Sequence, residues 1–160
     1  MQLGTTAQKL KALGVQALGI VATNAERARL FFRFRPPRVP VGADPELHTH
    51  RAYGLPRSQF TAELAQALEP VIAVRARELH LDLPRPLNDA FAAMDRLDGF
   101  ERAQSDDADS KRHQVQLTGQ FLVDHDGIIR WAFVECAQEG LAGADKFPPD
   151  EELLAAARAL

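Results

Sequence analysis

Cys136 is the only cysteine of the 160-residue chain and therefore its only candidate redox thiol. A reactive thiol needs a lowered pKa, which a nearby cation, a helix N-terminus or a metal provides. Glu135 and Glu139 flank this thiol and oppose its ionisation, and Arg130 lies roughly 20 Å away at ~3.3 Å per strand residue. A helical turn opening at "CAQEGLAG" would instead favour the thiolate. Two interpretations stay open, an inert cysteine at a strand end and a catalytic one.

The five histidines do not form a metal-binding pattern. His48 and His50 flank Thr49 in an expected short helix, where residues i and i+2 point to different sides. They cannot readily grip one ion, so we expect solvated imidazoles on the helix surface and no metal or cofactor. The remaining histidines are scattered without ligand spacing: His80, His113 and His125.

Arginines recur through residues 27–38 without an intervening acid, interleaved with phenylalanines. Such a run could form a patch for phosphate or nucleic acid. It equally fits the solvated face of a helix whose phenylalanines fill the core while arginine stems cover apolar surface, which is the interpretation that we adopt. The arginines concerned are Arg27, Arg29, Arg33, Arg35 and Arg38.

Composition narrows the class of protein. A chain of this length with 46 % hydrophobic residues fits a single domain that can fold alone. Its net charge of -3 creates no global field that would recruit nucleic acid or an anionic membrane. We see neither a secretion signal in "MQLGTTAQKLKALGV" nor an apolar run of ~18 residues, and one cysteine cannot form an intrachain disulfide. We therefore expect a cytoplasmic protein with no membrane partner and no nucleic-acid partner.

The elements that position these residues alternate between helix and strand. An apolar run of strand length, 15–22, follows a helix over 5–13 that Gly14 would end. A capping box at Thr23–Glu26 predicts the start of the next helix, and Pro36–Pro37 would stop it. Two further elements are expected next: a strand in 38–44 and a short helix in 45–54.

The second half of the chain is predicted to hold an insertion, a hairpin and a final helix. Residues 55–116 look like two or three helices followed by a polar mobile loop, 101–114. Strands 119–124 and 128–134 join through a turn at His125–Gly127. We expect Trp131 and Phe133, which share one strand face, to pack beneath the C-terminal helix, 148–160.

Four segments of the chain carry a family resemblance, and they follow one another in this order: "LKALGVQALGIVATNAERARLFF", "VPVGADPELHTHRAYGL", "QFLVDHDGIIRWAFV" and "DEELLAAARAL". Together they resemble the alkyl hydroperoxide reductase and thiol-specific antioxidant family, the peroxiredoxin-like branch of the thioredoxin fold. The resemblance implies one α/β domain, 1–160, with a thioredoxin-like mixed sheet of about four strands flanked by helices and a helical insertion at about 55–116. It also implies an antioxidant or thiol oxidoreductase activity.

The resemblance does not supply a complete active site. It places Met1 partway along the family's first long helix, so the family's peroxidatic cysteine and the strand before it would lie upstream. Thr118 stands where the family has an arginine that polarises the peroxide, and the cis-proline of dithiol-exchange relatives is missing. Cys136 is then the residue left for catalysis.

Without that strand, residues 15–22 and 119–124 would face a gap lined by unpaired backbone groups, which are costly to bury. We expect direct antiparallel pairing of these two strands, in the order 38–42, 15–22, 119–124, 128–134. A partner chain across the gap is the other route, with a homodimer as the accompanying expectation.

Two functions follow from the sequence. The first is a peroxiredoxin-like thiol oxidoreductase that works through Cys136 with an external thiol reductant, or the C-terminal part of a longer gene product that carries the peroxidatic cysteine. The second is a catalytically silent thioredoxin-fold module that acts in protein association.

Overall fold

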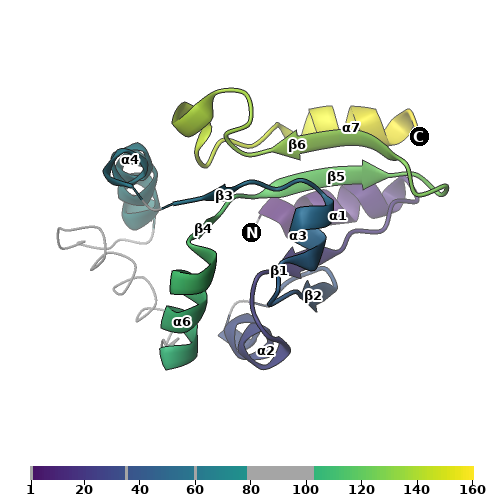
Figure 1. Ribbon diagram of the computed structural model, residues 1–160. Helices are drawn as coiled ribbons and strands as arrows, with labels where there is room; N and C mark the ends of the chain where they lie inside the picture. The colour runs from purple at the N-terminus through teal and green to yellow at the C-terminus, as the bar shows by residue number, and fades with distance from the viewer. Residues whose placement is uncertain (1, 35, 60, 79–102) are drawn as a thin grey trace. The chain divides into compact units, whose positions relative to one another are not determined.

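The computed structural model describes all residues except 1, 35, 60 and 79–102 (Figure 1). Helices and short strands alternate along it, so the chain is a mixed α/β protein, as the sequence predicts. It divides into two compact units. Unit 1 consists of Met1–Pro56, Leu117–Glu135 and Lys146–Leu160, and unit 2 of Arg57–Gln116 and Cys136–Asp145.

Unit 1 begins with a parallel β–α–β arrangement. Its elements are α1 (Gln2–Ala12), β1 (Gly19–Val21), α2 (Ala25–Phe34), β2 (Val41–Ala43) and α3 (His48–Ala52). β1 and β2 pair in parallel, with Gly19 opposite Val41, and α2 is the crossover that such a pair requires. The predicted glycine ends of the first and third helices are confirmed, because Gly14 and Gly54 have φ values of +83° and +71°.

Helix α2 begins one residue later than the capping box predicts. The side-chain oxygen of Asn24 accepts the backbone N–H of Arg27 at 2.9 Å. An N-cap oxygen bonds the second or third helical N–H, and Arg27 is the third residue of a helix that begins at Ala25. Asn24 is therefore the N-cap, in place of Thr23.

The predicted hairpin and final helix of unit 1 are confirmed. Strands β5 (Gly119–Val123) and β6 (Ile129–Val134) are antiparallel, and helix α7 (Asp150–Arg158) follows. The carboxylate of Asp124 holds the turn, because its Oδ1 accepts the backbone N–H of Asp126 and that of Ile128, both at 2.9 Å. Its Oδ2 accepts the Nε–H of Arg130 at 2.6 Å.

The core of unit 1 lies between this hairpin and two helices. Its buried side chains are Leu10, Leu122, Leu154 and Ala157. Trp131 packs against this cluster, and its Nε1–H donates to Glu152 on α7 at 3.3 Å, so the expected cover by the C-terminal helix is confirmed for Trp131. The ring of Phe133 contacts Phe147, just before α7, at a centroid distance of 5.9 Å.

The predicted closure of the sheet is wrong. The described strands form three two-stranded sheets, and no ladder joins 15–22 to 119–124. The N–H of Val15 donates to the carbonyl of Leu10 at 3.0 Å, and the Val15 side chain packs on the core. The start of the expected strand is therefore bonded to the end of α1. Within 15–22, only Gly19–Val21 forms a strand.

Unit 2 contains most of the predicted insertion. Its described elements are β3 (Arg57–Ser58), α4 (Ala62–Glu78), α6 (Gln104–His113), β4 (Val115–Gln116) and the 3-10 helix η1 (Gly140–Gly143). β3 and β4 pair antiparallel, with Arg57 opposite Gln116. The helix predicted over 87–97 lies outside the described residues.

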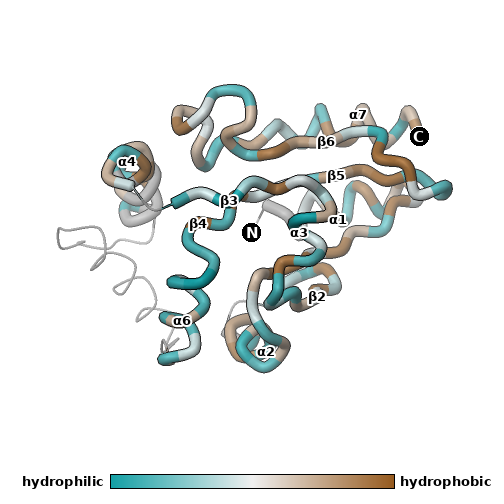
Figure 2. The backbone as a smooth tube through the Cα atoms, viewed as in Figure 1, coloured by the Kyte–Doolittle hydropathy of each residue, from teal (hydrophilic) through white to brown (hydrophobic). Residues whose placement is uncertain are grey.

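The loop predicted over 101–114 is wrong, because most of it is helix α6. Figure 2 shows this helix as a mainly hydrophilic segment, unlike the apolar β5 and β6. The carboxylate of Asp106 accepts the backbone N–H of Ala103 at 2.7 Å, and Arg112 pairs with Asp109 one turn earlier at 2.6 Å. Acids in the first turn and bases in the last complement the helix dipole, so local charge order forms a helix that hydrophobic periodicity does not reveal. None of the described helices is long and apolar enough to cross a membrane.

Candidate functional site

A buried acid connects the parallel strand pair to helix α3. Asp44 directly follows β2, and its backbone N–H donates to the carbonyl of Val21 in β1 at 2.8 Å. Leu47 then turns the chain in the left-handed conformation, with φ +57°, and its side chain is only 2 % exposed. These two anchors place the start of α3 beside the Asp44 carboxylate.

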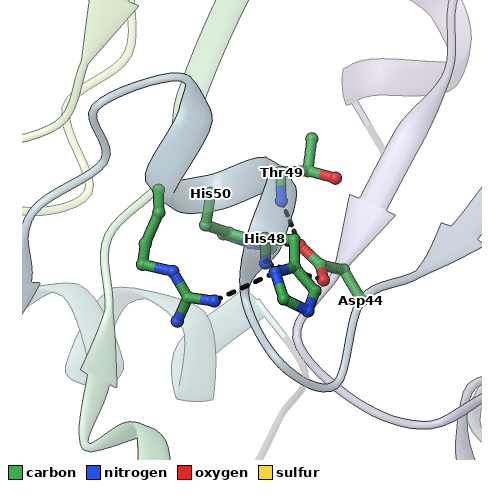
Figure 3. A network of polar contacts seen from close by, with 5 residues as sticks. Asp44, His48, Thr49 and His50 are labelled. Carbon is green, nitrogen blue, oxygen red and sulfur yellow. Dashed lines mark hydrogen bonds and ion pairs between the residues drawn. The ribbon is translucent and has the colours of Figure 1, made fainter.

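The carboxylate of Asp44 caps α3 with both oxygens (Figure 3). Oδ1 accepts the backbone N–H of His48 at 2.9 Å, and Oδ2 accepts that of Thr49 at 2.8 Å. The Nδ1 atom of His50 lies 3.2 Å from Oδ2. The Asp44 and His50 residues are only 7 % and 8 % exposed. We call these four residues, Asp44 with His48, Thr49 and His50, the Asp44 network.

The Asp44 network keeps its acid ionised. Burial alone would raise the pKa of Asp44, but hydrogen bonds from the His50 imidazole and from the backbone of His48, Thr49 and His50 stabilise the carboxylate. The balance lowers the pKa of Asp44 from 3.8 to about 2. Asp44 is therefore a permanent anion at neutral pH whose oxygens already bind donors of this chain, so its chemistry is to hold α3 in place.

The sequence prediction for the two neighbouring histidines is right for one and wrong for the other. His48 is exposed, and its Nδ1 contacts the guanidinium of Arg51 at 3.2 Å. His50 is buried against Asp44, because alternate positions on the short helix do point to different sides. An acid directly before a helix start is a capping signal. The sequence predicts this short helix over 45–54, so that signal could have pointed to Asp44, although α3 itself begins only at His48.

Cys136 lies in a tight turn directly after β6. Residues 135–139 form the turn, η1 follows it, and the thiol residue is partly exposed. Cys136 has a φ of +63°, which is uncommon for a residue with a side chain. Gly143 lies beside it, since a Cβ there would be in ordinary contact, 3.4 Å from the Cys136 Cα. The turn is therefore compact and locally strained.

Two activators that the sequence suggests, Arg130 and a helix N-terminus, are not at Cys136 in the described part of the chain. Arg130 pairs with Asp124 at the other end of the hairpin. Helical structure begins only at Gly140, so Cys136 does not occupy a helix N-terminus. Glu135 is 9 % exposed, and its Oε2 accepts the backbone N–H of Thr118 at 2.9 Å. This hydrogen bond holds the carboxyl group of Glu135, the residue that directly precedes Cys136 in the sequence.

The arginine run is mostly exposed where it is described. Arg29 and Arg33 are exposed on α2. The stem of Arg38 packs over α1, where a Cβ on Gly4 would lie 2.9 Å from the Arg38 Cδ. Phe31 and Phe32 meet edge to face at 5.3 Å, and Arg35 lies outside the described residues.

The remaining histidines lie on separate elements where they are described. His113 is buried at the end of α6, and His125 is exposed in the hairpin turn. His80 lies outside the described residues. Within the described part of the chain, no cluster of three or more histidine, cysteine or acidic side chains could hold a metal ion.

Comparison with known proteins adds no relative. No protein-family model, curated protein or solved structure matches the chain. The function must therefore be argued from the Asp44 network, the Cys136 turn and the four segments that resemble the peroxiredoxin-like family.

Proposed function

We propose that this chain is a peroxiredoxin-like antioxidant protein with a thioredoxin-like fold, a thiol oxidoreductase that uses Cys136 and an external thiol. The observation that carries the proposal is the order of elements in unit 1. A parallel β1–α2–β2 unit is followed by the antiparallel β5–β6 hairpin and α7, and the four segments of the resemblance fall on these elements. A reducing compartment such as the cytoplasm would keep the single thiol available.

A single-cysteine cycle needs no second thiol in the chain. The Cys136 thiolate would attack the outer peroxide oxygen, forming an S–O bond while the O–O bond breaks and the electron pair leaves with the alkoxide. The proton released by the thiol converts the alkoxide to an alcohol. One external thiol would then displace water from the sulfenic acid, and a second would free Cys136 as an external disulfide leaves. The net reaction consumes one peroxide and two thiols.

The surroundings of Cys136 favour slow chemistry. The thiol is partly exposed, which permits access by peroxide and reductant. Glu135 and Glu139 oppose the charge of a thiolate, and the Arg130 guanidinium is held by Asp124. We therefore expect oxidation of Cys136 in single turnover and low steady-state turnover.

The second candidate is the catalytically silent association module. It is favoured by the Glu135 and Glu139 carboxylates, which oppose a thiolate at Cys136. It is also favoured by the Asp44 network, because both oxygens of that acid cap α3. It is also favoured by strand β5, which has only one strand partner in the described part of the chain.

The experiment that separates the two candidates measures peroxide consumption by the wild-type chain and by Cys136→Ser. Oxidoreductase function predicts that peroxide oxidises one thiol per wild-type chain and that a sulfenic acid can be trapped at Cys136. The variant should show neither change. Peroxide loss at equal rates in both proteins, with Cys136 still reduced, would reject the oxidoreductase and leave the silent module.

A further inference from the structure

The two edges of the β5–β6 hairpin differ in a way that the backbone hydrogen bonds define. The carbonyl of Thr118 accepts the N–H of Glu135, and the N–H of Asp124 donates to Ile128. Leu122 lies opposite Trp131 and Val123 opposite Ile129, so the extra residue of the bulge, Arg130, belongs to β6. β5 therefore alternates without interruption between Thr118 and Asp124.

This alternation leaves one set of peptide groups directed away from β6. Because successive peptide groups of a strand point to opposite edges, the even positions from Thr118 to Asp124 face β6. The N–H and C=O groups of Gly119, Phe121 and Val123 face the opposite edge. No strand pairs with that edge in the described part of the chain.

The residues of β5 carry none of the side chains that usually block pairing at a strand edge. Exposed edges are commonly blocked by charged side chains, prolines or bulges. Residues 119–123 read "GQFLV" and contain no charge and no proline. The β6 strand, in contrast, carries both the bulge and Arg130, whose side chain is 53 % exposed.

We propose that the β5 edge pairs antiparallel with the β5 edge of a second copy of this chain, about a two-fold axis at Phe121. In this register Gly119 lies opposite Val123 of the second copy, and Phe121 lies opposite its own counterpart. All three positions carry outward-facing donors and acceptors, so the edge is complementary to itself. The result is a four-stranded sheet in the order β6, β5, β5, β6.

Side chains near the edge fit this register. Phe121 packs on Tyr53, with ring centroids 4.8 Å apart, and Leu55 fills the space where Gly119 would carry a Cβ. The Val123 side chain is 39 % exposed and would lie beside the small Gly119 of the second copy. Two uncharged strands also bring no like charges opposite each other.

This inference deepens the association function, and it does not involve Cys136. Cys136→Ser should abolish thiol oxidation without changing the dimer, so the two hypotheses can fail separately.

The first test compares masses by light scattering across a concentration series. The wild-type chain should approach twice its mass of 17.6 kDa. Val123→Pro removes an outward N–H but none that faces β6, and should weaken the dimer by about tenfold or more. Val123→Thr, which keeps the N–H and the β-branch, should dimerise normally. A wild-type chain that stays monomeric, or Val123→Pro that dimerises as well as Val123→Thr, would overturn the proposal.

The second test needs no variant and therefore stands if Val123→Pro does not fold. Amide exchange of the wild-type chain should slow at Phe121 and Val123 as concentration rises. Gln120 and Leu122, which bond β6, should stay protected at every concentration. Equal exchange at Phe121 and Val123 in dilute and concentrated samples would contradict pairing at this edge.

Discussion

The Asp44 network and the Cys136 turn differ in how the fold uses a chemically active side chain. Asp44 is buried, and both of its oxygens bind donors of the same chain. Cys136 carries the more reactive type of side chain, yet it is partly exposed in a strained turn, and the Arg130 guanidinium is bound to Asp124. The comparison teaches that hydrogen bonds around a residue, and not its chemical type, reveal what the fold uses it for.

The largest effect should come from removing the Asp44 carboxylate. Asp44→Ala leaves two backbone N–H groups and the His50 imidazole without their acceptor in a buried site. We expect a loss of about 3 kcal/mol in the free energy of unfolding, measured by urea denaturation. Asp126→Ala removes an acid whose side chain is 64 % exposed and should change little. Equal stability of the two variants would show that the network does not anchor α3.

Lowering the pH should weaken the same network in the wild-type chain. The pKa of Asp44 is about 2 in the folded state and 3.8 as its ordinary value. A lowered carboxyl pKa contributes stability that is complete at neutral pH and lost as the pH falls from about 4 to about 2. Its size is at most about 2 to 3 kcal/mol at ~1.4 kcal/mol per pKa unit.

The check is the difference in unfolding free energy between the wild-type chain and Asp44→Asn as a function of pH. The wild-type chain should lose its advantage over this acid range. A difference that stays constant from neutral pH to pH 2 would mean that Asp44 is not held ionised by its donors.

A smaller effect, in the opposite direction, is expected at Cys136. Because its φ is +63°, glycine relieves the strain whereas alanine retains it. Cys136→Gly should therefore be more stable than Cys136→Ala by about 1 kcal/mol. Thermal unfolding of the two variants measures this difference directly, since both lack the thiol. A more stable alanine variant would contradict the strained geometry of the turn.

The smallest effect should be on thiol reactivity. Cys136 should react with iodoacetamide at neutral pH no faster than a small free thiol, because its charged neighbours along the chain are acids. Acceleration of about tenfold or more would reveal an activating group and would support the oxidoreductase over the silent module.

Local signals predicted the parts of the fold that depend on neighbouring residues. The hairpin follows from strand alternation around Gly127, and the end of α1 follows from Gly14. Helix α6 was missed because its stability comes from Asp106 and from charge order, and not from an apolar face. The Asn24 cap differs from the prediction by only one residue, since adjacent Thr and Asn residues can both cap a helix.

Long-range contacts explain what the sequence did not reveal about the candidate site. Burial of His50 depends on Asp44, whose place is fixed by Val21 in another strand. The failed pairing of 15–22 with 119–124 depends on Val15, which the end of α1 captures. Cys136 was found by its chemistry, but the left-handed backbone of its turn, with φ +63°, is not indicated by its neighbours in the sequence.

The Asp124 turn has a consequence for the order of folding. Among the described residues, its carboxylate contacts groups no more than six residues away. The turn can therefore form before any distant part of the chain arrives, on the microsecond scale of hairpins. The parallel β1–β2 pair instead requires α2 to be in place. If the hairpin belongs to the folding nucleus, Asp124→Ala slows refolding and leaves the unfolding rate nearly unchanged. The turn would then act as a timing element that lets the second half of unit 1 become ordered first.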